Sequence, residues 1–323
     1  MPTQTQNTAI SLVALKDSAR LLAFQHEYDA SGPGRSARYE LSYGMSPELL
    51  DEFAPLVHGR VLSVHASCPR RDSFPNLASA DSRVIAQSRE DLRLSLDTVL
   101  RFGAGIMVLH PGYATDRLVP SEALFRQRML TDVEFQPYIW KSKGSICSPD
   151  YVREPRYRDF TNRALKNLVD VAVDCAGRGV KLAIENLNPR VGYLFQTPEE
   201  MVSITKTHPE LYLCVDIGHL WASSCVYRFD YLDALRAIIA TGKVVTSHLH
   251  SNPSRCASNP ADPETGVYED SHSSLDRWEM PYVESIQMLA AARVNLVLEV
   301  KEEPLRNMLL LQRLRFPGFA LGS

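Results

Sequence analysis

Residue types that bind metals end six apolar segments of this sequence. Each segment has the composition of a buried strand, and a charged group at the end of such a strand costs free energy unless something pairs with it or binds it. Three imidazoles and three carboxylates in equivalent positions indicate one shared site. The residues are His65, His110, Glu185, Asp216, His250 and Glu299.

Three further candidates follow strand-like segments at short distance. His219 comes three residues after Asp216 in the sequence DIGH, and Asp270 and His272 stand together in DSH. Aspartate and histidine at such spacings can converge on one ion when the chain turns back at the end of a strand. We therefore add these three residues to the candidate ligands.

The segment SHLH holds a second histidine that competes for a ligand position. His248 lies two residues before His250, so both side chains face the same side of a strand. We favour His250 as the ligand because it lies nearer the end of the strand. His248 is then assigned to a substrate contact, with a role as alternate ligand left open.

The combination of side chains favours metal chemistry. Carboxylates gathered at one place repel each other strongly unless cations lie between them. Imidazole and carboxylate together suit Zn²⁺, Mn²⁺ or Fe²⁺, and no cysteine is needed. The set is too large for one ion, and it fits two or three divalent ions if Glu185 bridges two of them. We expect two or three Zn²⁺ ions.

Apolar segments alternate with amphipathic helical patterns along the chain. This alternation indicates a parallel sheet covered by helices. An eighth strand at residues 11–15 or 20–24 would complete a (β/α)₈ TIM barrel of the α/β class, as a single domain over residues 1–323. A doubly wound sheet is less favoured because no GxGxxG follows the first strands. The other strand-like segments are residues 37–43, 60–66, 105–111, 180–186, 211–217, 243–250 and 295–301.

Two connections are far longer than the roughly 2 to 6 residues that are usual in such folds. Residues 113–160 and residues 251–280 each follow the carboxyl end of a strand, where barrel enzymes keep their chemistry. We expect them to be long active-site loops that could act as a lid. Elsewhere, TPEE at residues 197–200 predicts a helix start with a capping box.

Composition and charge narrow the class of partner. The net charge of −3 creates no basic field for nucleic acid or for an anionic membrane. No apolar run approaches the roughly 18 residues of a membrane span. The six cysteines form no CxxC pair, so we expect reduced thiols in a cytoplasmic protein. The sequence predicts a small-molecule partner and leaves the oligomeric state open.

With these residues in view, the chain resembles the endonuclease IV and xylose isomerase-like superfamily of TIM barrels. The resemblance covers roughly residues 36–300. It is most specific where a strand-end histidine, an NLAS turn, a helix and a second strand ending in HPG follow one another in residues 64–113. The later motifs IENL, DIGH, HLHSN, DSH and LEV appear in the same order as in that superfamily.

The resemblance implies a division of the ligands among three zinc ions. A first ion would be held by His65, His110 and Glu185, and a third by His219, Asp270 and His272. Glu185 would bridge to a second ion, which Asp216, His250 and Glu299 complete. The isomerase and epimerase branch keeps one ion at the position of this second set, and its two glutamates, here Glu185 and Glu299, also move protons.

The resemblance also points to substrate contacts. In the nuclease the loop after the first histidine presents wedge residues to DNA, and here that loop reads SCPRRDSFP. Phe74 could act as such a wedge and Arg71 could meet a phosphate. Asn186, directly after Glu185, is expected to contact the substrate or to support a ligand.

The favoured interpretation is a metal-dependent phosphoesterase, in which metal-activated hydroxide attacks phosphorus. The DSH motif, with His65 and His110, favours this trinuclear branch, and the low net charge and long loops favour a small phosphorylated sugar or nucleotide over duplex DNA. One alternative is a single-metal sugar isomerase or epimerase, with Glu185 and Glu299 exchanging a proton next to a carbonyl. The others are an endonuclease for abasic DNA and a non-enzymatic metal-binding protein.

Overall fold

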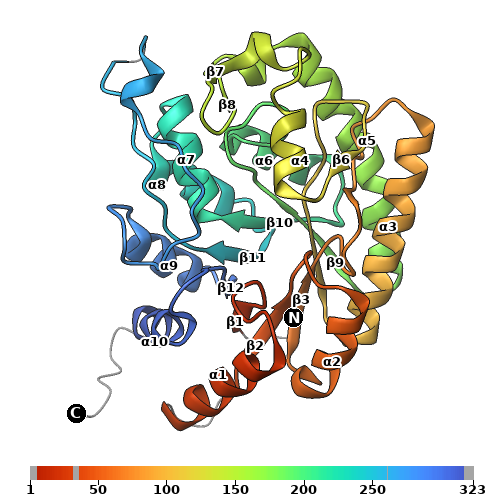
Figure 1. The fold of residues 1–323 in the computed structure, drawn as a ribbon, viewed down its shortest axis with the longest axis vertical. Coiled ribbons are helices and arrows are strands. Elements are labelled where there is room, and N and C mark those ends of the chain that lie inside the picture. The colour runs from red at the N-terminus through yellow and green to blue at the C-terminus, as the bar shows by residue number, and fades with distance from the viewer. Residues whose placement is uncertain (1–5, 32–35, 260, 316–323) are drawn as a thin grey trace.

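Eight parallel strands close into a barrel in the computed structural model, which describes residues 6–31, 36–259 and 261–315 (Figure 1). Neighbours around the barrel follow the order β1-β12-β11-β10-β9-β5-β3-β2. The (β/α)₈ barrel predicted from the sequence is confirmed. Its strands are β1 (Thr8–Ser11), β2 (Arg38–Leu41), β3 (Val61–His65), β5 (Ile106–Leu109), β9 (Lys181–Glu185), β10 (Leu211–Asp216), β11 (Val244–Leu249) and β12 (Asn295–Leu298).

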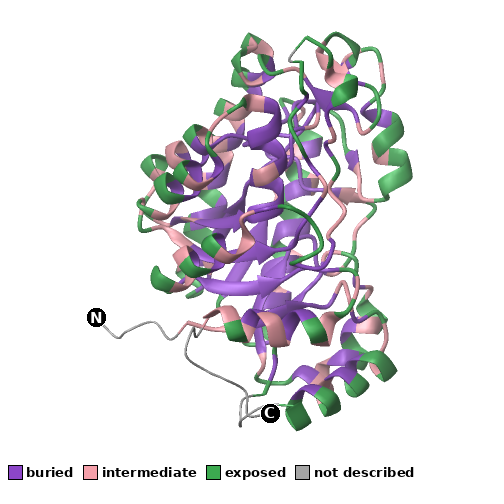
Figure 2. Ribbon diagram, turned by 90° about the vertical axis from the view of Figure 1, so that its left-hand side faces the viewer, coloured by how far each residue is buried: buried purple, intermediate pink, exposed green. Residues whose placement is uncertain are grey.

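Helices surround the barrel, while the strands that they cover are buried (Figure 2). None of the described helices has the length and apolar character needed to cross a bilayer. The predicted capping box is present, since Thr197 and Glu200 exchange hydrogen bonds at the start of α6. The surrounding helices are α1 (Ser18–Ser31), α2 (Pro47–Val57), α3 (Ser82–Arg101), α5 (Pro155–Gly177), α6 (Pro198–Thr207), α7 (Ile217–Tyr227), α8 (Tyr231–Ile239), α9 (Tyr282–Ala291) and α10 (Pro304–Arg315).

The eighth strand lies earlier than the sequence suggested. Strand β1 covers Thr8–Ser11, so it only touches the proposed segment 11–15, and residues 20–24 belong to α1. Its position follows from pairing on both sides, because Ala9 aligns with Val297 of β12 and with Arg38 of β2. A four-residue strand that closes a barrel is held by these two ladders more than by its own apolar content.

The loop of residues 113–160 is folded rather than irregular. Its strand β6 (Val119–Pro120) pairs with β4 (Ser73–Phe74), which ties the loop to the segment after β3. Helix α4 (Ala123–Met129) follows, and then a hairpin of β7 (Ile139–Lys141) and β8 (Ile146–Cys147). Figure 1 shows these elements together beyond one end of the barrel.

The two long loops are joined to each other. The ammonium group of Lys141 is buried and donates a hydrogen bond of 2.8 Å to the carbonyl oxygen of Gly266. It also lies 3.3 Å from the carbonyl oxygen of Glu264 and 3.6 Å from the Glu264 carboxylate. Residues 113–160 and 251–280 are therefore joined by a polar contact around the Lys141 ammonium group, and the rings of Trp140 and Tyr268 pack beside it with centroids 5.6 Å apart.

Candidate metal centre

The strand ends converge as the barrel geometry requires. His65, Glu185 and Asp216 are the last residues of β3, β9 and β10, and their side chains are buried. His110, His250 and Glu299 each come one residue after β5, β11 and β12. Because parallel strands of a barrel end at the same rim, six residues spread over 235 positions of the chain meet at one place.

The first ligand group consists of His65, His110 and Glu185. Their candidate ligand atoms all lie within 4.8 Å of one another. His65 Nε2 is 3.0 Å from Glu185 Oε2, and His110 Nε2 is 3.5 Å from the same oxygen. The two imidazole rings meet edge to face, with centroids 4.8 Å apart. The structure thus brings together the three residues that the sequence assigns to a first ion.

The second group contains Glu185, Asp216, Glu299 and His248, again with ligand atoms within 4.8 Å. His248 Nδ1 is 3.2 Å from Glu185 Oε1 and 3.3 Å from Glu299 Oε2. The sequence favours His250 for this place and makes His248 a substrate contact. His250 Nε2 lies 3.1 Å from Asp216 Oδ1, so both histidines border this group, and both are completely buried.

The strand register explains how His248 comes to border this group. His248 is aligned with Asp216 across the β10–β11 ladder, so the two side chains stand at the same height inside the barrel. Strand β11 ends at Leu249, and His250 already belongs to the loop that follows. His250 nevertheless approaches the Asp216 carboxylate from one residue beyond the strand, the position that His110 and Glu299 also have.

The third group gathers His219, His250, Asp270 and His272 within the same 4.8 Å limit. Asp270 lies between two imidazoles, with Oδ2 3.2 Å from His219 Nε2 and Oδ1 3.2 Å from His272 Nε2. The rings of His250 and His272 stack with centroids 4.0 Å apart. His219, Asp270 and His272 come together as the sequence predicts, and His250 joins them as a fourth member.

Glu40 is a member of the site that sequence reasoning missed. It lies on β2, is completely buried, and accepts a 2.7 Å hydrogen bond from Ser63 Oγ. His248 Nε2 is 3.0 Å from Glu40 Oε1. A carboxylate on Nε2 keeps the proton there and leaves the Nδ1 lone pair directed at Glu185 and Glu299. The signal was a glutamate inside the strand-like segment ARYELSY.

Electrostatics favour a cation in this cluster. Burial raises the pKa of a carboxyl group, but His248 and His110 outweigh burial and hold the pKa of Glu185 well below its usual range. In the described part of the chain, no lysine or arginine lies within 4.0 Å of the carboxylates of Glu185, Asp216 or Glu299. Buried carboxylates with imidazoles but no lysine or arginine beside them are what a divalent ion would neutralise.

Metal binding is expected to tighten as the pH rises from about 6 to about 9. Burial lowers the pKa of His272, but Asp270 outweighs it and raises the pKa to about 9, so the metal-free imidazole holds a proton at neutral pH. An ion must displace that proton, and each displaced proton makes the affinity up to about tenfold stronger per pH unit. Competition with a metal-binding dye measures this, with exposed His26→Ala as control. An affinity independent of pH would contradict the interpretation.

Three residues predicted to meet the substrate are engaged elsewhere. Asn186 is buried, and its amide both donates to the Asp216 carbonyl oxygen and accepts from the Asp216 backbone N–H, each at 2.9 Å. It therefore positions Asp216. Arg71 forms an ion pair through its Nε with Asp91 at 2.8 Å, so Asp91 already neutralises its charge. Phe74 is only 3% exposed and cannot act as a protruding wedge.

Aromatic side chains pack against the two histidines of the first ligand group. Phe74 lies with its ring centroid 5.7 Å from that of His110 and 5.3 Å from that of Tyr43. Tyr43 in turn lies 5.4 Å from the His65 ring, and the hydroxyl of Tyr113 lies 3.5 Å from His110 Nδ1. Tyr43 and Tyr113 were not predicted, although the motif HPGY places Tyr113 three residues after a ligand.

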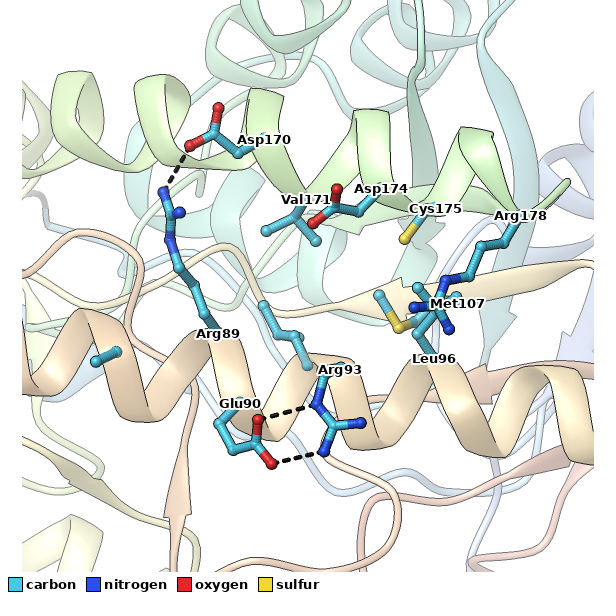
Figure 3. A pocket seen from close by; sticks show the side chains of 12 residues that line it. Arg89, Glu90, Arg93, Leu96, Met107, Asp170, Val171, Asp174, Cys175 and Arg178 are labelled. Carbon is cyan, nitrogen blue, oxygen red and sulfur yellow. Dashed lines mark hydrogen bonds and ion pairs between the residues drawn. The ribbon is translucent and has the colours of Figure 1, made fainter.

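A separate groove lies on the outer wall between α3 and α5 (Figure 3). Its charged side chains are paired with one another, as in Arg89 with Asp170 at 2.6 Å and Arg93 with Glu90 at 2.8 Å. These are exposed ion pairs, which contribute little energy, and among the described residues no histidine and no cluster of unpaired carboxylates lines the groove. The rim of the barrel is therefore the candidate functional site.

Comparison with known proteins agrees with this architecture. The sequence matches the profile of the xylose isomerase-like TIM barrel family over residues 22–314. A search of curated protein sequences finds no match. Among solved structures, a D-tagatose 3-epimerase-like protein is similar with a TM-score of 0.61 and 17% identity, covering 95% of this chain and 95% of that one.

Two further structures are similar over most of their length. The D-psicose 3-epimerase of Clostridium cellulolyticum H10, solved with D-tagatose, has a TM-score of 0.59 and 14% identity, covering 94% of this chain and 89% of that chain. A Thermus thermophilus protein soaked with ZnCl₂ has a TM-score of 0.58 and 19% identity, covering 98% of this chain and 100% of that chain.

These comparisons correct the favoured interpretation of the sequence. The similar structures include several sugar epimerases, so the predicted phosphoester hydrolase is wrong, and the alternative of an isomerase or epimerase fits better. The physical reason for the error is that both chemistries use the same ligand types at the same strand ends. Histidines and carboxylates at a barrel rim indicate that a metal binds there, but they do not indicate which reaction the metal site catalyses.

Proposed function

Because the chain belongs to the xylose isomerase-like TIM barrel family, we propose that it is a metal-dependent epimerase or isomerase of a small sugar. The observation that carries this proposal is the second ligand group, in which two glutamates face each other across one histidine nitrogen. Glu185 and Glu299 lie 3.2 and 3.3 Å from His248 Nδ1. Two carboxylates placed in this way can remove a proton from one face of a carbon atom and return a proton to its other face.

The residues present fit a divalent ion. Three carboxylates and one imidazole, Glu185, Asp216, Glu299 and His248, offer the oxygen and nitrogen ligands that Mn²⁺ and Zn²⁺ accept. A bound ion would polarise the carbonyl oxygen of the sugar and so acidify the neighbouring C–H group. The groups around His65 and around Asp270 contain ligands for a second and a third ion, and we infer that up to three bind.

Glu185 and Glu299 are the proposed acid and base. One carboxylate takes the proton from the carbon next to the carbonyl group, and that carbon becomes planar. The other carboxylate returns a proton to the opposite face, which inverts the configuration without any net change in atoms or charge. Return of a proton to the adjacent carbon would instead give an isomerase.

The two long loops supply the enclosure that such proton transfer needs. Aromatic groups from the segment after β3 and from residues 113–160 line one side of the metal centre, and residues 251–280 carry Asp270 and His272 on another. We infer that these loops close over a small sugar and keep water from the reacting carbon. A duplex would have to displace them.

Incubation with ketoses in deuterium oxide tests the proposal. We expect metal-loaded protein to introduce deuterium next to the carbonyl group and to produce the epimeric or isomeric sugar, both visible by NMR. Removal of metal with a chelator should abolish exchange, and Mn²⁺ or Zn²⁺ should restore it. Protein that holds one or more equivalents of metal but exchanges no proton in any ketose or aldose would sink the proposal.

A further inference from the structure

Arg126 is a half-buried cation in the 113–160 loop that has no acidic partner. Its Nη1 donates hydrogen bonds to the carbonyl oxygens of Pro120 and Ser121, at 3.0 and 2.7 Å, and its Nε donates to the Tyr193 hydroxyl at 3.2 Å. Across the residues that the structure describes, no carboxylate lies within 4.0 Å of it, and Nη2 has no hydrogen-bond acceptor.

Two other half-buried or partly exposed arginines of the same loop are neutralised. Arg117 forms an ion pair with Asp132, and Arg156 pairs with Glu134 at 2.6 Å. A guanidinium that is partly removed from water keeps its charge, so its lack of a counter-ion costs free energy unless a ligand supplies one. Arg128 and Arg158 form no ion pair among the described residues either, but both are exposed to water, so Arg126 differs in lacking a counter-ion while half-buried.

The position of Arg126 relates it to the metal centre. Its Cζ lies 4.9 Å from the centre of the Phe74 ring, and the same ring lies 5.7 Å from the His110 ring. Tyr193, which accepts from Arg126, packs edge to face on Tyr113 at 5.4 Å, and the Tyr113 hydroxyl approaches His110. One layer of aromatic rings therefore separates the guanidinium from the first ligand group.

The guanidinium is held in place before any ligand arrives. Strand β6 (Val119–Pro120), which supplies one of its acceptors, pairs with β4 (Ser73–Phe74), which supplies the ring beneath it. Strand β6 thus holds the Arg126 guanidinium by a hydrogen bond, and strand β4 supports it through the Phe74 ring. A guanidinium that is positioned in advance loses little entropy on binding, and its Nη2, the one nitrogen not already engaged, can donate two N–H groups to an anion.

We propose that Arg126 binds an anionic group of the substrate, a phosphate or a carboxylate, while the carbonyl end of the same molecule lies at the metal centre. This rests on the proposed epimerase or isomerase function and narrows its substrate class to sugar phosphates or sugar acids. Arg126 then determines specificity at a distance from the reacting carbon. The interaction is a charge-assisted pair in a partly desolvated place.

Binding calorimetry on metal-loaded protein tests this inference without requiring turnover. The probes are a neutral ketose, the same ketose phosphorylated at its far end, and the corresponding sugar acid. We expect one anionic probe to bind about 10- to 100-fold more tightly than the neutral ketose, and Arg126→Met to remove that preference. The anion that gains more identifies the group that Arg126 recognises.

The matched control is Arg128→Met. Arg128 lies on the same helix, α4, with its Cζ 5.9 Å from the exposed ring of Phe125, and should bind all probes as the unaltered protein does. If Arg126→Met lowers the thermal unfolding temperature, Arg126→Lys retains the charge without the fork and should keep part of the preference.

Two outcomes separate failure of the inference from failure of the proposed function. Equal affinity for neutral and anionic sugars, or an unchanged preference in Arg126→Met, would overturn the anion site. Arg126-dependent binding of inorganic phosphate by a protein that exchanges no proton in any sugar would support the anion site while the proposed reaction fails.

Discussion

Glu185→Gln is expected to lower the rate of sugar proton exchange by about 100- to 10,000-fold, the range for loss of a general base or acid. Glutamine retains the shape and one oxygen ligand but cannot take a proton. The loss should be large because Glu185 also joins two ligand groups, with Oε2 near His65 and Oε1 near His248. Deuterium uptake followed by NMR, with metal content measured on the same sample, gives the result.

Companion variants separate catalysis from metal loss. Glu299→Gln should reduce the rate of exchange by a similar factor, since one carboxylate removes the proton and the other returns it. Glu302→Gln, three residues further on and paired with Arg277 at the surface, should leave the rate unchanged. A Glu185→Gln protein that keeps its metal and its full exchange rate would remove Glu185 from the reaction.

The second large effect concerns the choice between two histidines. His248→Ala is expected to weaken the affinity for the ion of the second ligand group by more than about 100-fold, because loss of a ligand costs more than the 10- to 100-fold of a supporting residue. His250→Ala should weaken that ion far less and act chiefly on the group that contains His219, Asp270 and His272, although His250 also lies 3.1 Å from Asp216. Metal equivalents retained after dialysis, and dye competition, distinguish the two variants.

Each of these variants serves as the other's control, since both remove an imidazole that is completely buried. His248→Gln is a second test if the alanine variant unfolds, because glutamine can still accept or donate beside Glu40. The reverse pattern, with His250→Ala losing the catalytic ion, would return His250 to the role that the sequence favours.

Strand ends were predictable because barrel geometry is so restrictive. His65, Glu185 and Asp216 were read from apolar segments alone, since every parallel strand of a closed barrel must end at the same rim. That His248 stands level with Asp216 required the register of β11 against β10, which depends on long-range pairing. A single sequence carries no direct signal for that register.

The ion-pair partners of the arginines could not be predicted from the sequence either. Arg71 looked available for a phosphate, but it pairs with Asp91, 20 positions away on α3. Arg126 is one of eight basic residues in the segment 113–160, and only the folded loop shows that it has no carboxylate beside it while Arg117 does. Ion pairing between distant segments decides which charges remain for a ligand, and residue types do not reveal it.

The reaction itself could not be predicted from the ligands. The motifs DIGH, HLHSN and DSH resemble those of a nuclease, and the same residue types serve metal-dependent hydrolysis and proton transfer equally well. The two glutamates that make an epimerase plausible were already among the predicted ligands. Their second role depends on which substrate lies between them.

The contact between Lys141 and the 263–266 segment bears on the rate of turnover. Its buried ammonium joins the 113–160 loop to the 251–280 loop, so neither can swing away from the rim without breaking that contact. A sugar enclosed beneath them would leave when the two loops move as one body, on the microsecond to millisecond scale of such motions. Product release would then depend on this joint motion, and a variant that removes the Lys141 ammonium group should change the rate of release.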